Sequence, residues 1–315
     1  MVGLEIIPFI LISSYIAWGI GANDETMMIA ASGSSLSVNR LALVGAIVTC
    51  VGAIVCGQIV EETIGKGILT FPATTRIGLI IVVATASWLT VVSYFGWPIS
   101  TSHSTIGAVI GYGVFAGGLQ KINWQILNIL FLSWIATPIL GLFLCYLIVK
   151  PLAKKKDSTD NLSKRWLYAL LFGAVLQEFW QGANNVSNAT AFLSATFEYP
   201  LVSRAIGGIS LAIGLLTLGR RVLIAAGLRI TRLPINAAFV SQTIIVLINA
   251  IGTLYGLPLS GTHLSVACLI GAGLAAETKI DYKMCRNVIL YWVLTLPGAA
   301  LFSILIAQIS TLIPA

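Results

Sequence analysis

The tetrapeptide Gly21-Ala22-Asn23-Asp24 recurs later in the chain as Gly182-Ala183-Asn184-Asn185. A second motif, Pro98-Ile99-Ser100-Thr101-Ser102-His103, recurs as Pro258-Leu259-Ser260-Gly261-Thr262-His263. The copies lie 161 residues apart for the first motif and 160 for the second, so the two halves keep nearly one register. Unpaired polar groups cost several kcal/mol each in hydrocarbon, so polar repeats in an apolar chain mark a site.

The composition predicts a multi-pass membrane protein. Of the 315 residues, 57% are hydrophobic and 9% are charged, and the mean hydropathy is +0.95. A soluble domain carries about 25% charged residues. The net charge of +7 comes from basic residues that cluster in loops, as the positive-inside rule expects, so nucleic acid is not an expected partner. The five cysteines show no metal-type spacing and are interpreted as core residues.

Apolar spans of the length that crosses a ~30 Å hydrocarbon core occur throughout the chain. We expect such spans near 41–60, 77–96, 98–118, 123–149, 201–218, 235–255, 258–276 and 286–313. Each half also begins with a span, 4–22 or 166–180, that we expect to break at the Gly-Ala-Asn motif and to resume as 26–36 or 186–197.

The charged loops predict how the two halves are oriented. The linker 150–165 and the loop 219–234 are strongly basic and are expected in the cytoplasm. An odd number of crossings in each half then inverts the second repeat, 166–315, relative to the first, 1–149, and places both termini outside. The same parity holds if 77–96 and 98–118 form a re-entrant pair. The fold class is therefore an all-α bundle of two inverted-topology repeats with broken helices, possible re-entrant hairpins and about 10–12 membrane segments.

The two proline–hydroxyl–histidine loops have the composition of helix starts that bind an anion. Ser and Thr cap helix N-termini, and the exposed N–H groups and dipole attract negative charge without a cationic side chain. Two such starts that converge at the midplane can hold a small tetrahedral oxyanion. The expected anion ligands are Ser100, Thr101, Ser102, Ser260, Gly261 and Thr262. The competing interpretation is a pair of ordinary capped helices with close glycine packing.

The repeated Gly-Ala-Asn motifs carry the candidate cation ligands. Carboxylate and amide oxygens, with carbonyls freed by a helix break, suit a hard cation such as Na⁺. The candidates are Asp24, Asn23, Asn184, Asn185 and Asn188. A helix cap facing water is the alternative.

Three further residues are candidates for proton transfer. The chain's two histidines, His103 and His263, hold equivalent positions, and histidine is the side chain whose unperturbed pKa lies near neutral pH. They can relay protons, but we favour a local role in orienting the hydroxyl loops. Glu178 has no counterpart in the first half, and a functional and an interfacial role are equally open. Glu61 and Glu62 are interpreted as loop charges.

At these motifs the chain resembles the inorganic phosphate transporter (PiT) family of sodium- or proton-coupled symporters. The resemblance also includes the run from Gly214 to Val222 and covers essentially the whole chain. It implies a central site for phosphate and coupling cations, with Asn23 and Asn184 at the phosphate. The chain departs from the duplicated family signature, which reads GANDxxN, at Met27 and Asn185, and it has Gln242 where the family has Glu.

These features together predict a secondary active transporter that imports inorganic phosphate by symport with Na⁺ or H⁺, by alternating access around a midplane site. No bond is broken, so we expect no enzyme activity and no cofactor besides the coupling ion. The alternatives are a sulfate or other oxyanion permease, or a passive anion channel. We expect a multi-pass protein of the cell membrane, which can form a homodimer in the bilayer.

Overall fold

The computed structural model describes residues 6–22, 37–95, 99–153, 160–219 and 233–312. Within these ranges the chain is helical, and its sole β contact is an isolated bridge between Leu69 and Ile122. The α-helices are α1 (Ile6–Ala22), α3 (Val38–Cys56), α4 (Gln58–Glu62), α5 (Thr75–Tyr94), α6 (Thr101–Gly117), α7 (Trp124–Ala153), α8 (Asp160–Thr196), α9 (Pro200–Gly214), α11 (Ile235–Leu254), α12 (Gly261–Ala275) and α13 (Tyr282–Thr311). The predicted all-α class is confirmed.

Six of the described helices are long and apolar enough to cross a membrane: α3, α5, α7, α9 with the π-helical turn Leu215–Gly219, α11 and α13. Helices α1 and α12 are apolar but shorter. Helix α8 is the longest described helix, at 37 residues, and carries polar side chains along much of its length. The protein is therefore a multi-pass membrane protein with one polar helix among its apolar ones.

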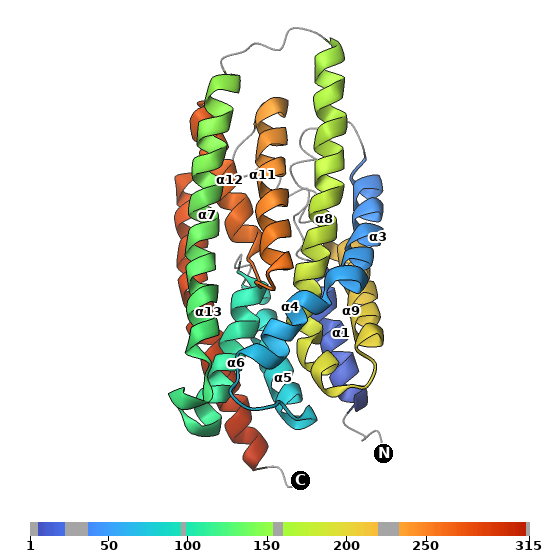
Figure 1. Ribbon diagram of the computed structural model, residues 1–315, viewed down its shortest axis with the longest axis vertical. Helices are drawn as coiled ribbons and strands as arrows, with labels where there is room; N and C mark the ends of the chain where they lie inside the picture. The colour runs from blue at the N-terminus through green and yellow to red at the C-terminus, as the bar shows by residue number, and fades with distance from the viewer. Residues whose placement is uncertain (1–5, 23–36, 96–98, 154–159, 220–232, 313–315) are drawn as a thin grey trace.

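The two repeats run in opposite directions through the bundle. Helix α1 begins and α13 ends at the lower end in Figure 1, whereas α7 ends and α8 begins at the upper end. Each repeat therefore crosses the bundle an odd number of times. The predicted inverted topology is confirmed.

Two of the predicted spans are halves of re-entrant hairpins. Helix α6 runs from the middle of the bundle to the lower end, and α12 runs from the middle to the upper end (Figure 1). Their first turns meet, since the ring centroids of His103 and His263 are 4.5 Å apart. The α5–α6 pair thus enters and leaves at one end, and the α11–α12 pair does so at the other.

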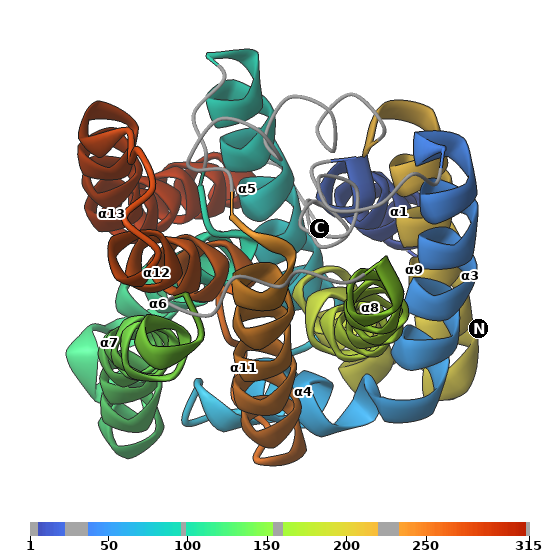
Figure 2. The same ribbon diagram turned by 90° about the horizontal axis from the view of Figure 1, so that it is seen from above.

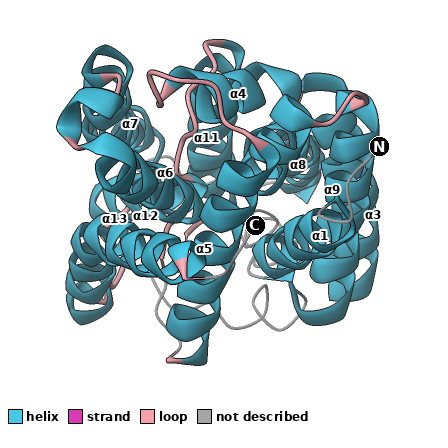
Figure 3. Cartoon of the chain, turned by 90° about the horizontal axis from the view of Figure 1, so that it is seen from below, coloured by secondary structure: helices cyan, strands magenta, loops and turns pink. Residues whose placement is uncertain are grey.

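The repeats interleave instead of forming separate halves. Helices α1, α3, α8 and α9 make one group and α6, α7, α12 and α13 the other, with α5 and α11 between them (Figures 2 and 3). Each group contains helices from both repeats. Both large hydrophobic clusters likewise contain buried residues from both repeats. Because lipid is as apolar as these side chains, close packing has to hold the groups together.

Equivalent glycines make that packing possible. A Cβ on Gly21 of α1 would lie 2.0 Å from the carbonyl oxygen of Leu211 in α9. A Cβ on Gly182 of α8 would lie 2.2 Å from the carbonyl oxygen of Thr49 in α3. The glycine of each Gly-Ala-Asn motif therefore brings its helix into backbone contact with a helix of the other repeat.

The predicted helix break in the second repeat is wrong. Helix α8 runs without interruption from Asp160 to Thr196, through Asn184 and Asn185. Asn184 forms its side-chain hydrogen bonds with residues outside α8, so it does not compete for the backbone bonds of its own helix. No backbone carbonyls are freed there. In the first repeat α1 ends at Ala22, and the residues that follow, 23–36, lie outside the described part of the chain.

Candidate functional site

The two hydroxyl loops are built alike and start their helices in the same way. Ser100 caps α6, and its side chain accepts a hydrogen bond of 3.3 Å from the His103 backbone N–H. Ser260 caps α12, and its side chain accepts one of 3.3 Å from the His263 backbone N–H. Both caps have extended backbone angles, as N-cap residues should. The predicted helix starts are thus present in both copies.

The loops also touch each other directly. The Ser102 hydroxyl donates to the carbonyl oxygen of Leu259 at 3.0 Å. The indole N–H of Trp134, in α7, donates to the carbonyl oxygen of Pro258 at 2.9 Å. The starts of α6 and α12 are therefore held head to head at the centre of the bundle.

The histidines form the middle of an aromatic row. The His103 ring lies 3.9 Å, centroid to centroid, from that of Trp134, and the His263 ring lies 3.5 Å from that of Trp292. Both histidines are buried. This packing fits the orienting role that we favour from the sequence, and the proton-relay role stays a prediction.

Two asparagines of α8 reach the loops. Asn184 donates through Nδ2 to the Thr253 hydroxyl at 2.9 Å and to the carbonyl oxygen of Leu257 at 2.8 Å. Asn188 donates through Nδ2 to the Ser102 hydroxyl at 3.3 Å. The Oδ1 atoms of both asparagines are buried, and no described residue donates to them. Each is therefore an acceptor available to a cation or to a donor on a substrate.

The other candidate cation ligands do not join this pair. Asn185 is buried on α8, but one residue turns a helix by about 100°, so its side chain leaves the helix in a different direction from that of Asn184. Asn23 and Asp24 lie outside the described residues. Nowhere in the described ranges do three or more His, Cys, Asp or Glu side chains gather as a metal cluster.

Glu178 is fully buried where α8 packs on α3. A Cβ on Gly45 of α3 would lie 2.8 Å from its Oε1 atom, so the absence of a side chain at Gly45 makes room for the carboxyl group. Glu178 lies seven residues before Asn185, and therefore near the same side of α8. Its proposed role in proton transfer stays a prediction.

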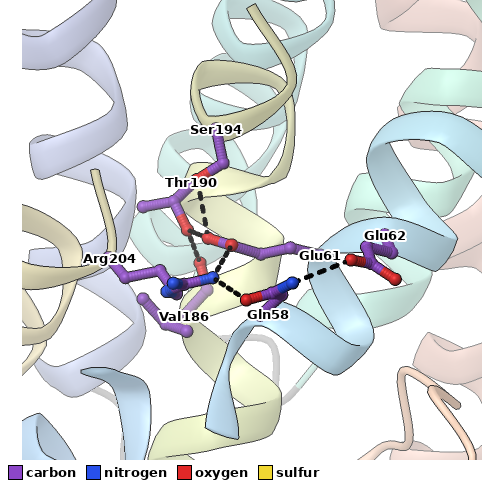
Figure 4. A network of polar contacts seen from close by, with 7 residues as sticks. All are labelled: Gln58, Glu61, Glu62, Val186, Thr190, Ser194 and Arg204. Carbon is purple, nitrogen blue, oxygen red and sulfur yellow. Dashed lines mark hydrogen bonds and ion pairs between the residues drawn. The ribbon is translucent and has the colours of Figure 1, made fainter. Parts of the chain in front are cut away.

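Glu61 is a correction to the sequence interpretation, because it is not a loop charge. It lies in α4 with 4% of its surface exposed and accepts hydrogen bonds from Thr190 and Ser194 of α8 (Figure 4). It forms an ion pair of 3.4 Å with Arg204 of α9. Arg204 also donates to Gln58 at 3.3 Å. This network joins one helix of the first repeat to two of the second.

The sequence contained a signal for this network. Arg204 lies within the apolar span 201–218, and a lone charge in such a span needs a buried partner. A second overlooked signal lies on α8, where the spacing of Gln177, Gln181, Asn184 and Asn188 is four, three and four residues. That spacing puts four amides on one face of the helix.

Both halves of the chain, and so both copies of each motif, match known proteins. The model of the phosphate transporter family matches residues 20–167 and 152–303. A protein of Thermococcus kodakarensis provisionally named a phosphate permease is 28% identical, with 96% of this chain and 98% of that protein aligned. The chloroplastic inorganic phosphate transporter 2-1 of Arabidopsis thaliana is 24% identical, over 96% of this chain and 71% of that protein.

A solved structure shares the fold. It is described as the sodium-dependent phosphate transporter and superposes with a TM-score of 0.90 at 22% identity, covering 99% of this chain and all of the other. The fold, the duplicated motifs and the two family-model matches lead to one assignment: this chain belongs to the phosphate transporter family.

Proposed function

We propose that the protein imports inorganic phosphate by symport with Na⁺, or with H⁺, through alternating access around the central site. The observation that carries this proposal is the head-to-head meeting of two capped helix starts from opposite ends of the bundle. Each start directs unpaired backbone N–H groups and a positive dipole end toward the same region. An oxyanion there needs no cationic side chain.

The hydroxyl groups supply further donors. Ser100 and Ser260 each accept a hydrogen bond from their own helix, and each keeps its hydroxyl hydrogen for the anion. No hydrogen bond within the described residues engages the Thr262 side chain. Ser102 already donates to Leu259, so its hydroxyl has to leave that carbonyl before it contacts the anion. The proposed ligands are Ser100, Thr101, Ser102, Ser260, the backbone of Gly261, Thr262, Asn184 and Asn23.

The coupling cation is proposed to bind at the asparagines. The unpaired Oδ1 atoms of Asn184 and Asn188 are one helical turn apart, and oxygen atoms are the ligands that hard cations prefer. Asp24 and Asn23 add a full negative charge and a third amide to the ligand set, with Asn185 as a further candidate. If H⁺ is the coupling ion, Asp24, His103, His263 and Glu178 are the groups that can carry it.

The same acceptor oxygens favour phosphate over sulfate. Monohydrogen phosphate carries an O–H group at neutral pH and sulfate carries none. An unpaired, buried Oδ1 can accept that hydrogen, and it would face only negative oxygens of sulfate. This reasoning ranks phosphate first and keeps a sulfate permease as the alternative.

The test uses purified protein in liposomes, with labelled phosphate or sulfate and imposed Na⁺ or H⁺ gradients. We expect phosphate to accumulate uphill when a Na⁺ gradient is imposed. Sulfate uptake under the same gradient would favour the permease alternative, and uptake that stops at equal concentrations would indicate a passive channel. Accumulation driven by H⁺ alone would assign the coupling to protons.

The orientation in the cell membrane is part of the proposal. The basic linker 150–165 and the loop 219–234 are assigned to the cytoplasm, and both termini to the outside. Within the loop 61–76, single cysteines at the exposed positions Thr70, Pro72 and Thr74 should react with an impermeant reagent outside the cell, whereas cysteines placed in 150–165 or 219–234 should not. A homodimer is tested by cross-linking in the bilayer.

A further inference from the structure

Gln181 lies where no ligand was expected from the sequence, against the first turn of α12. A Cβ on Gly261 would lie 2.4 Å from Gln181 Nε2, 2.7 Å from Oε1 and 2.8 Å from the carbon between them. The amide group therefore fills the space that a side chain at position 261 would need. Gly261 is the residue that lets α8 place a polar group against the N-terminus of α12.

The amide is held in one orientation. Its Oε1 atom accepts a hydrogen bond of 3.0 Å from Asn249 Nδ2 in α11 and a longer one of 3.4 Å from Gln177 Nε2 in α8. Because two donors occupy the oxygen, the Nε2 atom must point away from them. Gln181 is 8% exposed, and no hydrogen bond described in the structure uses its two N–H donors.

We propose that Gln181 is a ligand of the transported anion and donates from Nε2 beside the N-terminus of α12. This inference rests on the proposed function and adds a residue to its site. A buried amide whose oxygen is occupied and whose hydrogens are unused needs an acceptor, and an oxyanion at this helix start supplies one. Asn249 and Gln177 are then positioning residues, because they fix which end of the amide faces the site.

The first repeat supports the assignment by contrast. The positions equivalent to Gln181 and Gly261 are occupied by Ile20 and Thr101. On the first-repeat side a hydroxyl group on the helix start can donate to the anion, and the residue equivalent to Gln181 is apolar. On the second-repeat side the helix start has no side chain, and the neighbouring helix contributes the amide. At this pair of equivalent positions each side thus offers a side-chain donor, by a different route.

The competing explanation is that Gln181 only joins α8 to α11 through Asn249, as buried amides often do between membrane helices. Gln181→Glu separates the two explanations. It keeps an oxygen for Asn249 and Gln177 to donate to and replaces only the NH₂ group. Gln181→Met keeps the length of the side chain and removes both polar ends.

The controls are the corresponding substitutions at Asn236, a buried amide of α11 whose Oδ1 atom accepts from the Ala237 backbone N–H at 2.8 Å and whose Nδ2 atom donates to the carbonyl oxygen of Leu152 at 3.5 Å. Asn236 lies thirteen residues before Asn249, which is about 20 Å along the helix. Asn236→Asp and Asn236→Leu therefore make the same kinds of change in a buried amide, away from the proposed ligand. All variants are measured in liposomes for the KM of phosphate uptake, and in detergent for the rise in melting temperature that phosphate causes.

We expect both Gln181 variants to raise the KM about tenfold or more and to lose the stabilisation by phosphate, as for a lost hydrogen bond to a charged group. Both Asn236 variants should keep the wild-type KM. A wild-type KM in a folded Gln181→Glu protein would overturn the inference. If neither Gln181 variant folds, the KM of Gly261→Ala is measured instead, because its methyl group displaces the amide without removing any polar group. A raised KM would support the inference, and a wild-type KM would overturn it. Wild-type protein that neither binds nor transports phosphate would instead refute the proposed function.

Discussion

The two repeats share a fold and differ in the chemistry that they bring to its centre. Both loops are capped by a serine in the same geometry, and both motif glycines pack on a helix of the other repeat. Yet the second repeat carries Gln181, Glu178 and Asn185 where the first has Ile20, Ala17 and Asp24. Symmetry therefore places the helix starts, and under the proposed function the departures from symmetry set which ions the site accepts.

Substitutions in the two Gly-Ala-Asn motifs should have the largest effect on transport. Asp24 is the sole acid in the two Gly-Ala-Asn motifs, and an amide offers a cation only a dipole in place of a full charge. If Na⁺ is the coupling ion, Asp24→Asn should abolish sodium-driven uptake, and Asn185→Asp should strengthen its sodium dependence. If H⁺ is the ion, Asp24→Asn should flatten the pH dependence of uptake. Transport assays in liposomes, with expression and melting as controls, measure these changes.

Accumulation of the anion by Asp24→Asn at the wild-type level would show that this carboxylate is structural. The coupling group would then have to be sought elsewhere, with Glu178 as the next candidate.

The ion pair between Glu61 and Arg204 has no equivalent pair in the other half, since the position corresponding to Arg204 is apolar. Arg204→Met should lower the free energy of unfolding by about 3–5 kcal/mol, because it leaves a buried carboxylate without its counter-charge. Thermal or denaturant unfolding in detergent measures the loss. The double variant Glu61→Gln with Arg204→Met removes both charges and should recover much of it. Equal losses in the single and double variants would mean that the pair is not what stabilises the contact.

Equivalent hydroxyl residues of the two loops should respond differently to the loss of the hydroxyl. Thr262→Ala removes a donor that no described residue uses, so phosphate binding should weaken by about 1.5–3 kcal/mol with little change in stability. Ser102→Ala also removes the bonds to Leu259 and Asn188, so it should lower stability by about 1 kcal/mol as well. Thr262→Ser is the matched control and should bind phosphate normally. Unchanged affinity in Thr262→Ala would remove this residue from the site.

Much of the fold could be predicted from the repeats and the spans. The offset of 160–161 residues, the basic loops and the apolar spans together predicted an inverted bundle, and the structure confirms it. The interleaving of the repeats was not predicted, because which helix a glycine faces depends on three-dimensional packing. The break expected in the second repeat was wrong for a similar reason: Asn184 finds its partners, Thr253 and Leu257, in another element.

The candidate site could be predicted only where side chains act through local backbone geometry. The caps at Ser100 and Ser260 follow from residue types next to a proline. The burial of Glu61 could not be read from its flanking residues, since its partners come from α8 and α9. Gln181 was overlooked because its importance depends on Gly261, eighty residues further along the chain.

The smallest expected effect concerns the motif glycines, at which the two repeats should behave alike. Gly21→Ala and Gly182→Ala each place a methyl group against a carbonyl oxygen of a helix in the other repeat, at 2.0 Å and 2.2 Å. Overpacking of this kind costs about 1–3 kcal/mol, so both variants should lower the melting temperature in detergent by similar amounts. Gly19→Ala is the matched control, because a Cβ there meets no atom within 4 Å. Alanine also favours the helix over glycine by about 1 kcal/mol, so the control should melt at or slightly above the wild-type temperature. If only one of the two motif glycines proved sensitive, the close contacts between the repeats would not be equivalent, and the symmetry would extend to the helix starts but not to the packing that supports them.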